Sequence, residues 1–165
     1  MYSNKELIEK YPFLKVKDTY AAGTWTNCWL DDLEPGWRAA FGEDLVKELD
    51  KAIKEDGCED TFEFLQIKEK YASLRLYATG YGDKTREVLA KYEELSKYIC
   101  GHCGQVATRI TRGWVYPFCD KCARKIGQPT VPIEEFYETT YEDILDEIDH
   151  IKINYRYDDY WKPIK

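Results

Sequence analysis

Apolar residues recur at helical spacing in three stretches of the chain. In the first, Pro35 stands where a first helical turn accepts proline, and apolar side chains follow three or four residues apart as far as Gly57. A second stripe follows Asp83, which we expect to act as the helix N-cap. The third follows Thr140, with Asp143 at capping-box spacing. The pattern predicts three amphipathic helices.

The first 34 residues give weaker signals. Ser3 and Glu6 have the spacing of a capping box, and they predict a short helix. That helix should end at Tyr11-Pro12, because a residue before proline avoids helical dihedral angles. Residues 13–16 favour a short extended segment, and residues 18–34 favour an irregular loop. Three apolar side chains are expected to tether this loop to the core: Trp25, Trp29 and Leu33.

Alternating apolar and polar residues predict two neighbouring strands, at residues 62–67 and 71–77. One face of the second strand carries Ala72, Leu74 and Leu76, and the other carries Tyr71, Arg75 and Tyr77. Residues 151–157 also alternate, and they predict a last strand near the end of the chain.

The composition indicates a globular protein. Of the 165 residues, 44% are hydrophobic and 15% are aromatic. No stretch approaches the roughly 18 apolar residues of a membrane span. The chain begins with an amphipathic segment and not with a signal peptide. We therefore expect a cytoplasmic protein with no membrane partner.

The net charge of -7 is unevenly distributed. Residues 100–128 hold five basic and one acidic side chain, a net of +4, whereas residues 129–165 hold four basic and ten acidic side chains, a net of -6. The overall charge disfavours general attraction to nucleic acid, because phosphate binding needs accumulated positive charge. Two hypotheses remain: the basic segment could contact nucleic acid locally, and the acidic segments could bind a basic partner.

Four cysteines give the strongest chemical signal in the sequence. Cys100, Cys103, Cys119 and Cys122 form two C-x2-C pairs separated by fifteen residues. Zinc binds four thiolates in a tetrahedron, and disulfides are rare in a cytosolic protein. The intervening segment favours a hairpin with its turn near Arg112-Gly113, which would bring both pairs to one ion.

The two pairs differ in their surroundings. Glycines flank the first pair, as in a tight zinc knuckle, whereas the second pair opens a helix that Gly127 would end. A knuckle, a hairpin and a helix together resemble a treble-clef finger, and a zinc ribbon is the alternative. Four thiolates fill the coordination shell, so we predict one structural zinc ion with His102 as a bystander. Cys28 and Cys58 are expected to be ordinary, partly buried thiols.

These elements predict an α+β protein, in which a small antiparallel sheet packs with helices next to a treble-clef-like zinc module. The expected division is an α+β domain at residues 1–99, the zinc finger at residues 100–127 and an acidic extension of helix and strand at residues 128–165. Pro129 and Pro132 indicate a linker between the last two parts.

Catalytic groups are scarce in the sequence. His102 and His150 are the only histidines, which leaves few of the acid–base and nucleophilic arrangements that use this residue. There is no phosphate-binding glycine loop, and acidic pairs such as Asp31-Asp32 and Asp158-Asp159 are typical of an acidic surface. We therefore expect a binding protein and not an enzyme.

Three surfaces are candidates for recognition. The zinc hairpin and its helix combine basic and aromatic side chains suited to phosphate contact and base stacking: Arg109, Arg112, Trp114, Lys121, Arg124 and Lys125. Trp114 and Phe118 are, however, expected to build the small core of the finger. The strand face with Tyr71, near Lys68 and Lys70, is a second candidate unless a helix covers it, and the acidic, Tyr-rich C-terminal segment is a third.

Several stretches together resemble a group of uncharacterised small proteins encoded by bacteriophages and prophages. They are Tyr11-Pro12-Phe13-Leu14, Pro35-Gly36-Trp37-Arg38-Ala39-Ala40-Phe41-Gly42, Gln66-Ile67-Lys68-Glu69-Lys70-Tyr71 with Leu74-Arg75, and Gly113-Trp114 before Pro117-Phe118-Cys119-Asp120-Lys121-Cys122. The resemblance spans most of residues 10–125. It implies a viral or mobile-element origin and one zinc finger, and it carries over no catalytic residues.

The leading hypothesis from the sequence is a non-enzymatic, zinc-binding bacteriophage accessory protein in the cytoplasm of a bacterial host. Its acidic, Tyr- and Trp-rich composition favours binding to a host or viral protein, with inhibition of a nucleic-acid-handling defence system as one outcome. One alternative is a nucleic-acid-binding protein that uses the basic zinc finger. Another is a sponge that sequesters a small nucleotide signal.

Overall fold

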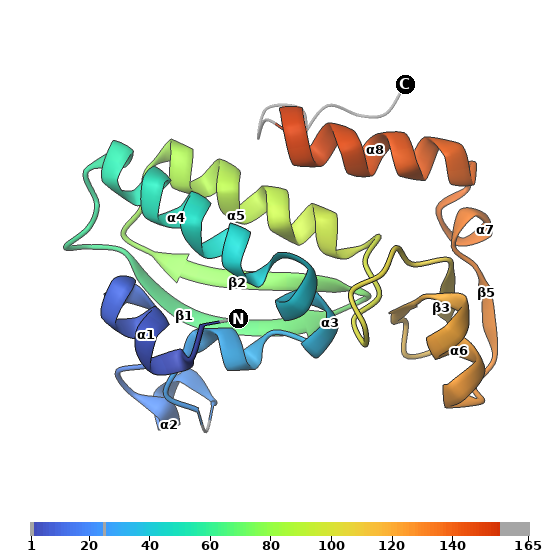
Figure 1. Cartoon of the computed structure of the whole chain (residues 1–165), viewed down its shortest axis with the longest axis horizontal. Coiled ribbons are helices and arrows are strands. Elements are labelled where there is room, and N and C mark those ends of the chain that lie inside the picture. Colours follow the sequence, from blue (N-terminus) through green and yellow to red (C-terminus); the bar gives the residue numbers. More distant parts are fainter. Residues whose placement is uncertain (1, 25, 156–165) are drawn as a thin grey trace.

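A two-stranded antiparallel sheet with helices packed against it makes up the larger part of the protein (Figure 1). The structure is a computed structural model, and it describes residues 2–24 and 26–155. The helical elements are α1 (Asn4–Lys10), the 3-10 helix η1 (Pro12–Leu14), α2 (Thr19–Ala22), the 3-10 helix η2 (Trp29–Asp32), α3 (Pro35–Trp37), the π-helix η3 (Arg38–Gly42), α4 (Glu43–Asp56), α5 (Asp83–Ser96), α6 (Asp120–Ile126), α7 (Ile133–Tyr137) and α8 (Tyr141–Asn154). The strands are β1 (Glu63–Lys70), β2 (Ser73–Thr79), β3 (Arg109–Thr111), β4 (Pro117–Phe118) and β5 (Thr130–Pro132).

The helix expected from Pro35 to Gly57 is confirmed, with one local change. α3, η3 and α4 follow one another without a break, and the five residues of η3 have π-helical hydrogen bonding. The helix ends at Gly57, whose φ of 66° is a left-handed conformation that glycine adopts without steric cost.

The N-terminal residues are more regular than predicted. The capping box of α1 is confirmed: the Ser3 hydroxyl accepts from the Glu6 N–H, and the Glu6 carboxylate accepts from the Ser3 N–H at 2.7 Å. The extended segment expected at residues 13–16 is wrong in its first half. Pro12 fixes φ for the first turn of η1, and the Lys15 N–H closes that turn on the Pro12 carbonyl at 3.1 Å.

The segment predicted as an irregular loop, residues 18–34, contains the short helices α2 and η2. The Asp18 carboxylate caps α2 by accepting from two backbone N–H groups. Trp29 and Leu33 are buried, which confirms that they tether this segment to the core. Trp25 lies outside the described residues.

The two predicted strands form the hairpin β1–β2, whose register pairs Ile67 with Leu76 and Lys68 with Arg75. One face is covered as expected, and its buried side chains include Ala72, Leu74 and Leu76. The other face is accessible at Tyr71 and Tyr77, whereas Ser73 between them is buried. The exposed fraction is 75% for Tyr71, in the turn, and 41% for Tyr77.

The N-terminus of α5 is capped differently from the prediction. Asp83 is the first helical residue, and the N-cap is Gly82. The capping carboxylate comes from Asp56 at the end of α4, which accepts from the Lys84 N–H at 3.2 Å and the Thr85 N–H at 2.8 Å. Glycine suits position 82 because a Cβ there would lie 2.7 Å from the Asp56 carboxyl carbon.

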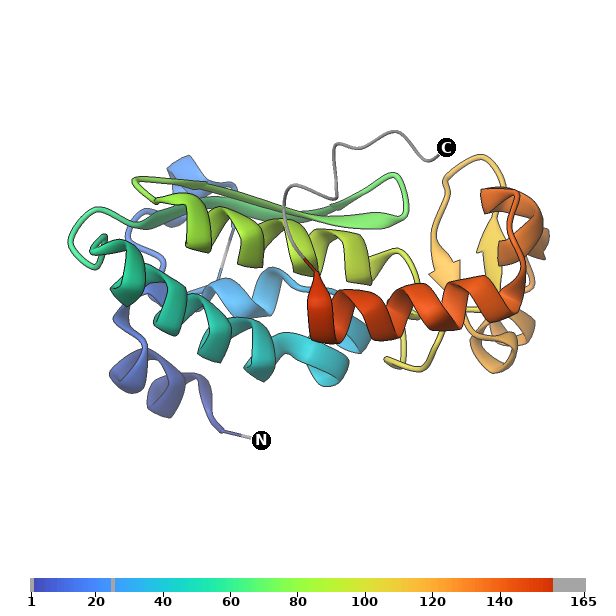
Figure 2. The same cartoon turned by 90° about the horizontal axis from the view of Figure 1, so that it is seen from above.

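One large core joins the β1–β2 hairpin to α1, α4, α5 and α8. Its fully buried side chains include Trp37, Leu45, Leu49, Leu74 and Ile144. α8 lies along α5 (Figure 2), which buries Ile144 and Ile148 of the apolar stripe predicted after Thr140, whereas Leu145 of that stripe is exposed. The capping box of Thr140 with Asp143 is confirmed. The helices and small antiparallel sheets confirm the α+β fold class.

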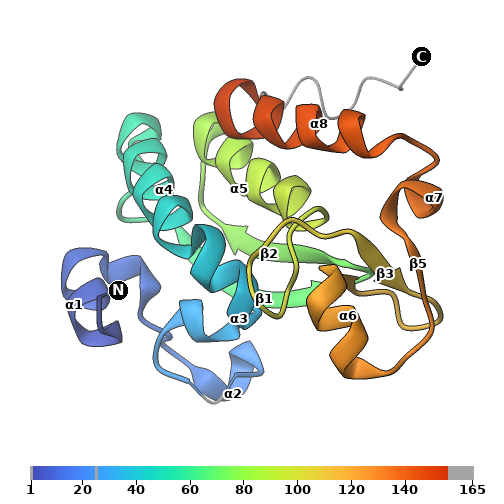
Figure 3. The same ribbon diagram turned by 45° about the vertical axis from the view of Figure 1, so that its right-hand side comes forward.

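A second, smaller sheet has the strand order β4-β3-β5 and lies beyond the turn of the β1–β2 hairpin (Figure 3). β3 and β4 form the predicted hairpin, with Gly113 at a φ of 84° in its turn. β5 occupies the segment predicted as a linker, and α7 follows it. An edge strand tolerates proline because its outer N–H groups need no partner, so Pro132 can end β5. The division into three parts at residues 1–99, 100–127 and 128–165 stays a prediction.

The last strand expected at residues 151–157 is wrong as far as the structure describes it. Residues 151–154 continue α8, and Ile151 extends the buried stripe of Ile144 and Ile148. That helical stripe outweighs the short alternation of the sequence. Three aromatic residues of the acidic segment lie outside the described residues: Tyr157, Tyr160 and Trp161.

Candidate metal centre

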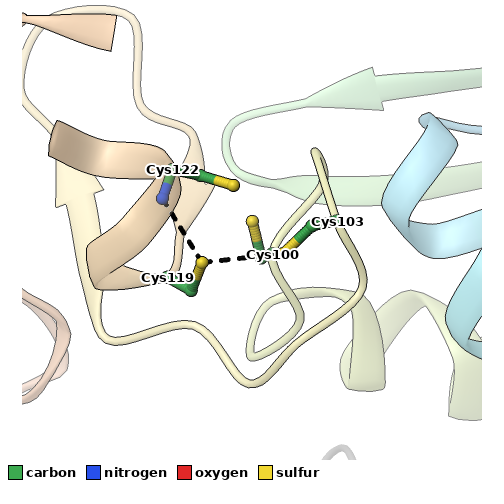
Figure 4. Close-up of side chains that lie close together, drawn as sticks. All are labelled: Cys100, Cys103, Cys119 and Cys122. Atoms are coloured by element: carbon green, nitrogen blue, oxygen red, sulfur yellow. Dashed lines mark hydrogen bonds between the residues drawn. The ribbon is translucent and has the colours of Figure 1, made fainter. Parts of the chain in front are cut away.

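The four cysteines expected to bind zinc come together between the turn that follows α5 and the start of α6 (Figure 4). Cys100 and Cys103 belong to the turn, Cys119 is the N-cap of α6, and Cys122 is the third residue of that helix. The second pair therefore opens a helix, as the treble-clef interpretation predicts. A zinc ribbon would have placed it on a second knuckle.

The sulfur positions fit one tetrahedral zinc ion. All four Sγ atoms lie within 4.8 Å of one another, and those of Cys103 and Cys119 are 3.6 Å apart. Zn–S bonds of about 2.3 Å in a tetrahedron place the sulfurs about 3.8 Å apart. Four thiolates complete the coordination shell, so the cluster is a candidate site for a single structural zinc ion. Within residues 2–24 and 26–155, no other group of metal-ligating side chains gathers in this way.

Three of the four thiols are buried, and Cys103 is exposed. Burial, together with the neighbouring Cys119 and Cys103 thiols, raises the pKa of the Cys122 thiol to about 12. Thiolates and not thiols bind zinc, so the cation has to displace these protons. Zinc affinity should therefore fall as the pH becomes acidic.

Backbone hydrogen bonds shape both cysteine pairs. The Cys100 N–H donates to the Gln105 carbonyl at 2.7 Å, and the Gly104 N–H donates to the Cys100 carbonyl at 2.9 Å. Gly104 has a φ of 82°, which a residue with a side chain rarely adopts. At the second pair, the Cys119 sulfur accepts from the Cys122 N–H at 3.5 Å, in the manner of an N-cap side chain.

The small core beside the cysteines contains fewer aromatic rings than predicted. Phe118 is buried against the cysteines and Ala123, and Tyr116 packs at the edge of this cluster. Trp114 is 80% exposed, so its predicted place in the core is wrong. It lies in the β3–β4 turn, where the Thr111 hydroxyl donates to the Trp114 carbonyl at 2.6 Å.

A close contact between the zinc module and α3 was not predicted. The Gly36 N–H donates to the Gly101 carbonyl at 2.7 Å, and a Cβ at position 36 would lie 2.2 Å from the Cys100 carbonyl oxygen. The Trp37 ring stacks on Tyr116, with ring centroids 6.4 Å apart and an interplanar angle of 14°. The available signal was the glycine within Pro35-Gly36-Trp37, at a position where a helix start alone does not require one.

Tyr116 also joins the two parts through a hydrogen bond. Its hydroxyl donates to the Glu34 carboxylate at 2.6 Å. Burial, with the adjacent Glu34 charge, raises the pKa of Tyr116 well above its ordinary value, so the hydroxyl keeps its proton and donates. Gly101 leaves room for this ring, because a Cβ there would lie 2.2 Å from the Tyr116 hydroxyl.

The basic residues proposed for partner contact fall into two groups. Arg109 is bound within the module, where its guanidinium donates to the hydroxyl and the carbonyl of Thr130 at 3.0 and 2.9 Å. Arg112 forms an exposed ion pair with Glu135 at 3.2 Å. The others are exposed on α6 and have no ion pair within the described residues: Lys121, Arg124 and Lys125.

The remaining cysteines and the histidine lie apart from the four-sulfur cluster. Cys28 and Cys58 are both buried and not partly buried, with exposed fractions of 0% and 7%. Burial raises the pKa of the Cys28 thiol. His102 is exposed, with its ring centroid 6.4 Å from that of Phe118. No described helix is both long and apolar enough to cross a membrane.

Comparison with known proteins gives one informative similarity. The chain is 38% identical over 52 residues to the large ribosomal subunit protein eL43 of Plasmodium falciparum (isolate 3D7), which covers 30% of this chain and 53% of that protein. The chain thus spans about half the length of the protein it matches. No family model and no solved structure matches the chain.

Proposed function

We propose that this protein is a zinc-stabilised nucleic-acid-binding protein that acts by binding and not by catalysis. The observation that carries the proposal is the α6 basic surface, formed by Lys121, Arg124 and Lys125. These side chains are exposed, and no acidic partner within the described residues neutralises them. Such cations bind phosphates and release the counterions that surround a nucleic acid.

Two further observations support nucleic-acid binding over the protein-binding hypothesis favoured by the sequence, and a third supports binding over catalysis. Trp114 is exposed in the same module, so an aromatic face is available for base stacking. Similarity to a protein of the large ribosomal subunit, a particle rich in RNA, favours RNA as the nucleic acid. Four thiolates on zinc leave no open coordination position for catalysis.

A triple substitution tests the proposal. Lys121→Ala, Arg124→Ala and Lys125→Ala together are expected to weaken binding of the zinc-loaded protein to a labelled single-stranded RNA. The slope of log affinity against log salt should fall by about 0.7 for each phosphate that the variant no longer neutralises. Fluorescence anisotropy at several salt concentrations measures both quantities.

The matched control removes three exposed lysines from other elements: Lys5→Ala, Lys47→Ala and Lys152→Ala. This variant has the same change in net charge, so it separates the local surface from general electrostatics. Equal losses of affinity in the two variants, or no RNA binding by the unchanged protein, would contradict the proposal.

A second candidate function is the binding of a host or viral protein by a bacteriophage accessory protein. The favouring observation is an exposed apolar set on α7 and α8: Phe136, Leu145 and Ile153, with exposed fractions of 42%, 39% and 77%. Aromatic side chains such as Phe136, with the Tyr137 ring 5.1 Å away, are enriched at the cores of protein interfaces. Affinity purification from a bacterial extract, with and without nuclease, tests this candidate, since a stoichiometric protein that survives nuclease supports it.

A further inference from the structure

Two aromatic side chains from distant parts of the sequence line one hollow of the protein surface. The hollow, of about 320 Å³, is lined by residues 68–71 at the β1–β2 turn and by residues 113–115 at the β3–β4 turn. The two turns lie side by side in Figures 1 and 3. Tyr71 and Trp114 are 75% and 80% exposed, so each turn presents a large ring to solvent. We call this the aromatic hollow.

The charged groups at the aromatic hollow are mainly cationic. Lys70 Nζ lies 5.3 Å from the Tyr71 ring centroid, and Lys68 Nζ lies 5.4 Å from that of Tyr77 on the same face of the hairpin. Glu69 is the one acidic lining residue among those described, and its carboxylate accepts from the Ala72 N–H at 2.9 Å. That hydrogen bond directs it to the turn backbone.

The β1–β2 turn adopts a strained conformation at this place. Tyr71 and Ala72 have φ values of 52° and 64°, the left-handed region in which hairpin turns usually carry asparagine and glycine. Non-glycine residues in this region are uncommon and cluster at ligand-binding sites. The turn therefore presents a ring where an ordinary hairpin would have a small polar residue.

We propose that the aromatic hollow binds an unpaired nucleobase, stacked on Tyr71 and Trp114, while Lys68 and Lys70 contact the adjoining phosphate. This inference rests on the proposed function, and it specifies that the nucleic acid is bound through a single-stranded segment. Stacking on exposed rings suits every base, because each base has a π-face, and neighbouring cations follow the backbone. A base in a duplex is already stacked and cannot enter.

The test compares two ring-removing variants of the full, zinc-loaded chain. Tyr71→Asn keeps the turn conformation, because asparagine tolerates a positive φ, and Trp114→Ala removes a side chain that is mostly in solvent. Each is expected to weaken binding of a labelled twelve-nucleotide single-stranded RNA about tenfold. Binding of a duplex of equal length should change less than about twofold. Tyr20→Ala, which removes a 91% exposed ring on α2, is the control and should leave both affinities unchanged.

The same two variants also decide whether the aromatic hollow is a base-binding site. If a free mononucleotide binds the unchanged protein and binds neither variant, the result would support a base site formed by the two rings. Unchanged RNA binding by both variants, while the α6 triple variant still binds RNA more weakly, would overturn this inference alone. The inference would also be overturned if the two variants lost equal affinity for the duplex and for the single-stranded RNA. It would likewise be overturned if the variants lost a protein that co-purifies with the unchanged chain but kept their RNA affinity. Absence of any RNA binding by the unchanged protein would overturn it together with the proposed function.

Discussion

Two regions of the molecule differ in the size of their apolar cores: the larger region, built around the β1–β2 hairpin, and the zinc module. The first has a continuous core that extends from α1 to α8 and encloses Trp37, Leu49 and Leu74 almost completely. The second has a separate cluster of five buried residues, of which three are thiols of the metal centre: Cys100, Phe118, Cys119, Cys122 and Ala123. Ala107 and Ile110 of the module are buried outside that cluster, and Ala107 belongs to the large core. A unit of roughly 30 residues with so small a core usually needs a metal or disulfides to fold.

The contrast predicts two sources of stability in one chain. Burial of apolar side chains stabilises the larger region, and zinc coordination is expected to stabilise the smaller one. The contact around Gly36, Trp37 and Tyr116 joins the two, so changes on either side of it should separate their contributions. The following predictions test this contrast, from the largest expected effect to the smallest.

Loss of the metal centre should have the largest effect, because the zinc module should unfold while the larger region stays folded. Cys119→Ser with Cys122→Ser is expected to abolish zinc binding, and structural zinc contributes roughly 10–16 kcal/mol in small zinc fingers. Elemental analysis should fall from one zinc per chain to none. Amide NMR signals of residues 100–132 should lose dispersion, while those of β1 and β2 keep it.

The control for this change is Cys58→Ala, which removes a buried thiol outside the cluster. It should leave the zinc content unchanged. Dispersed signals for residues 100–132 in the double variant would show that the module folds without the metal, and the contrast between the two regions would fail.

Truncation of a side chain in the large core should destabilise the larger region and leave zinc binding unchanged. Leu49 is fully buried on α4, so Leu49→Ala is expected to lower the free energy of unfolding by about 2–5 kcal/mol through reduced burial and a cavity. Urea denaturation measures the change, and the zinc content should remain one per chain. Leu65→Ala, at a position 52% exposed, should cost less than about 1 kcal/mol. Zinc loss in Leu49→Ala would mean that the regions do not fold separately.

Substitution at the contact itself should weaken the link between the regions. Gly36→Ala brings a Cβ to 2.2 Å from the Cys100 carbonyl oxygen, and this overpacking is expected to cost about 1–3 kcal/mol. In the unchanged protein, zinc should raise the midpoint of thermal unfolding of the whole chain by linkage. That rise should be smaller in the variant.

Gly42→Ala is the matched control, since its nearest neighbours are side-chain atoms 3.4 Å or more away. It also replaces a glycine within a helix, so a neutral or slightly stabilising effect is expected. If both glycine variants respond equally to zinc, the contact at Gly36 does not transmit stability.

Most of the architecture was predictable because local patterns and tertiary structure agree. The apolar stripe from Pro35 to Gly57, the capping boxes of α1 and α8, and the alternation around Leu74 are each buried or bonded as expected. The clustering of the four cysteines was predictable for a similar reason, since two C-x2-C pairs at this spacing can place four sulfurs around one ion.

The remaining features depend on contacts that sequence spacing does not encode. Trp114 was expected in the small core, but the space beside the cysteines is filled by Phe118 and Tyr116, and Tyr116 faces Trp37 of α3. The aromatic hollow likewise requires two turns about 40 residues apart to meet. Propensity and periodicity describe one element at a time, so they cannot give either result.

The N-cap of α5 also depends on a contact between distant residues, and its removal should give the smallest change in stability. Partial burial raises the pKa of Asp56, but hydrogen bonds from Thr85 and Lys84 outweigh it and lower that pKa below its ordinary value. Asp56→Ala should cost about 1 kcal/mol in the larger region at neutral pH without changing the zinc content. Asp83→Ala, at the residue the sequence favoured as the cap, should cost less than about 0.5 kcal/mol, because its carboxylate is exposed.

The pH dependence distinguishes the carboxylate cap from a packing effect. A carboxylate with a lowered pKa stabilises the folded state above its unfolded value of about 3.9, and this stability disappears as the pH falls through the folded pKa. The difference in unfolding free energy between the unchanged protein and Asp56→Ala should therefore narrow below about pH 4. The unfolding free energy of Asp83→Ala, measured in the same buffers, is the control for loss of zinc at acidic pH, because that loss affects both variants alike. A difference that stays constant with pH would assign the effect to packing around Gly82 and not to the cap.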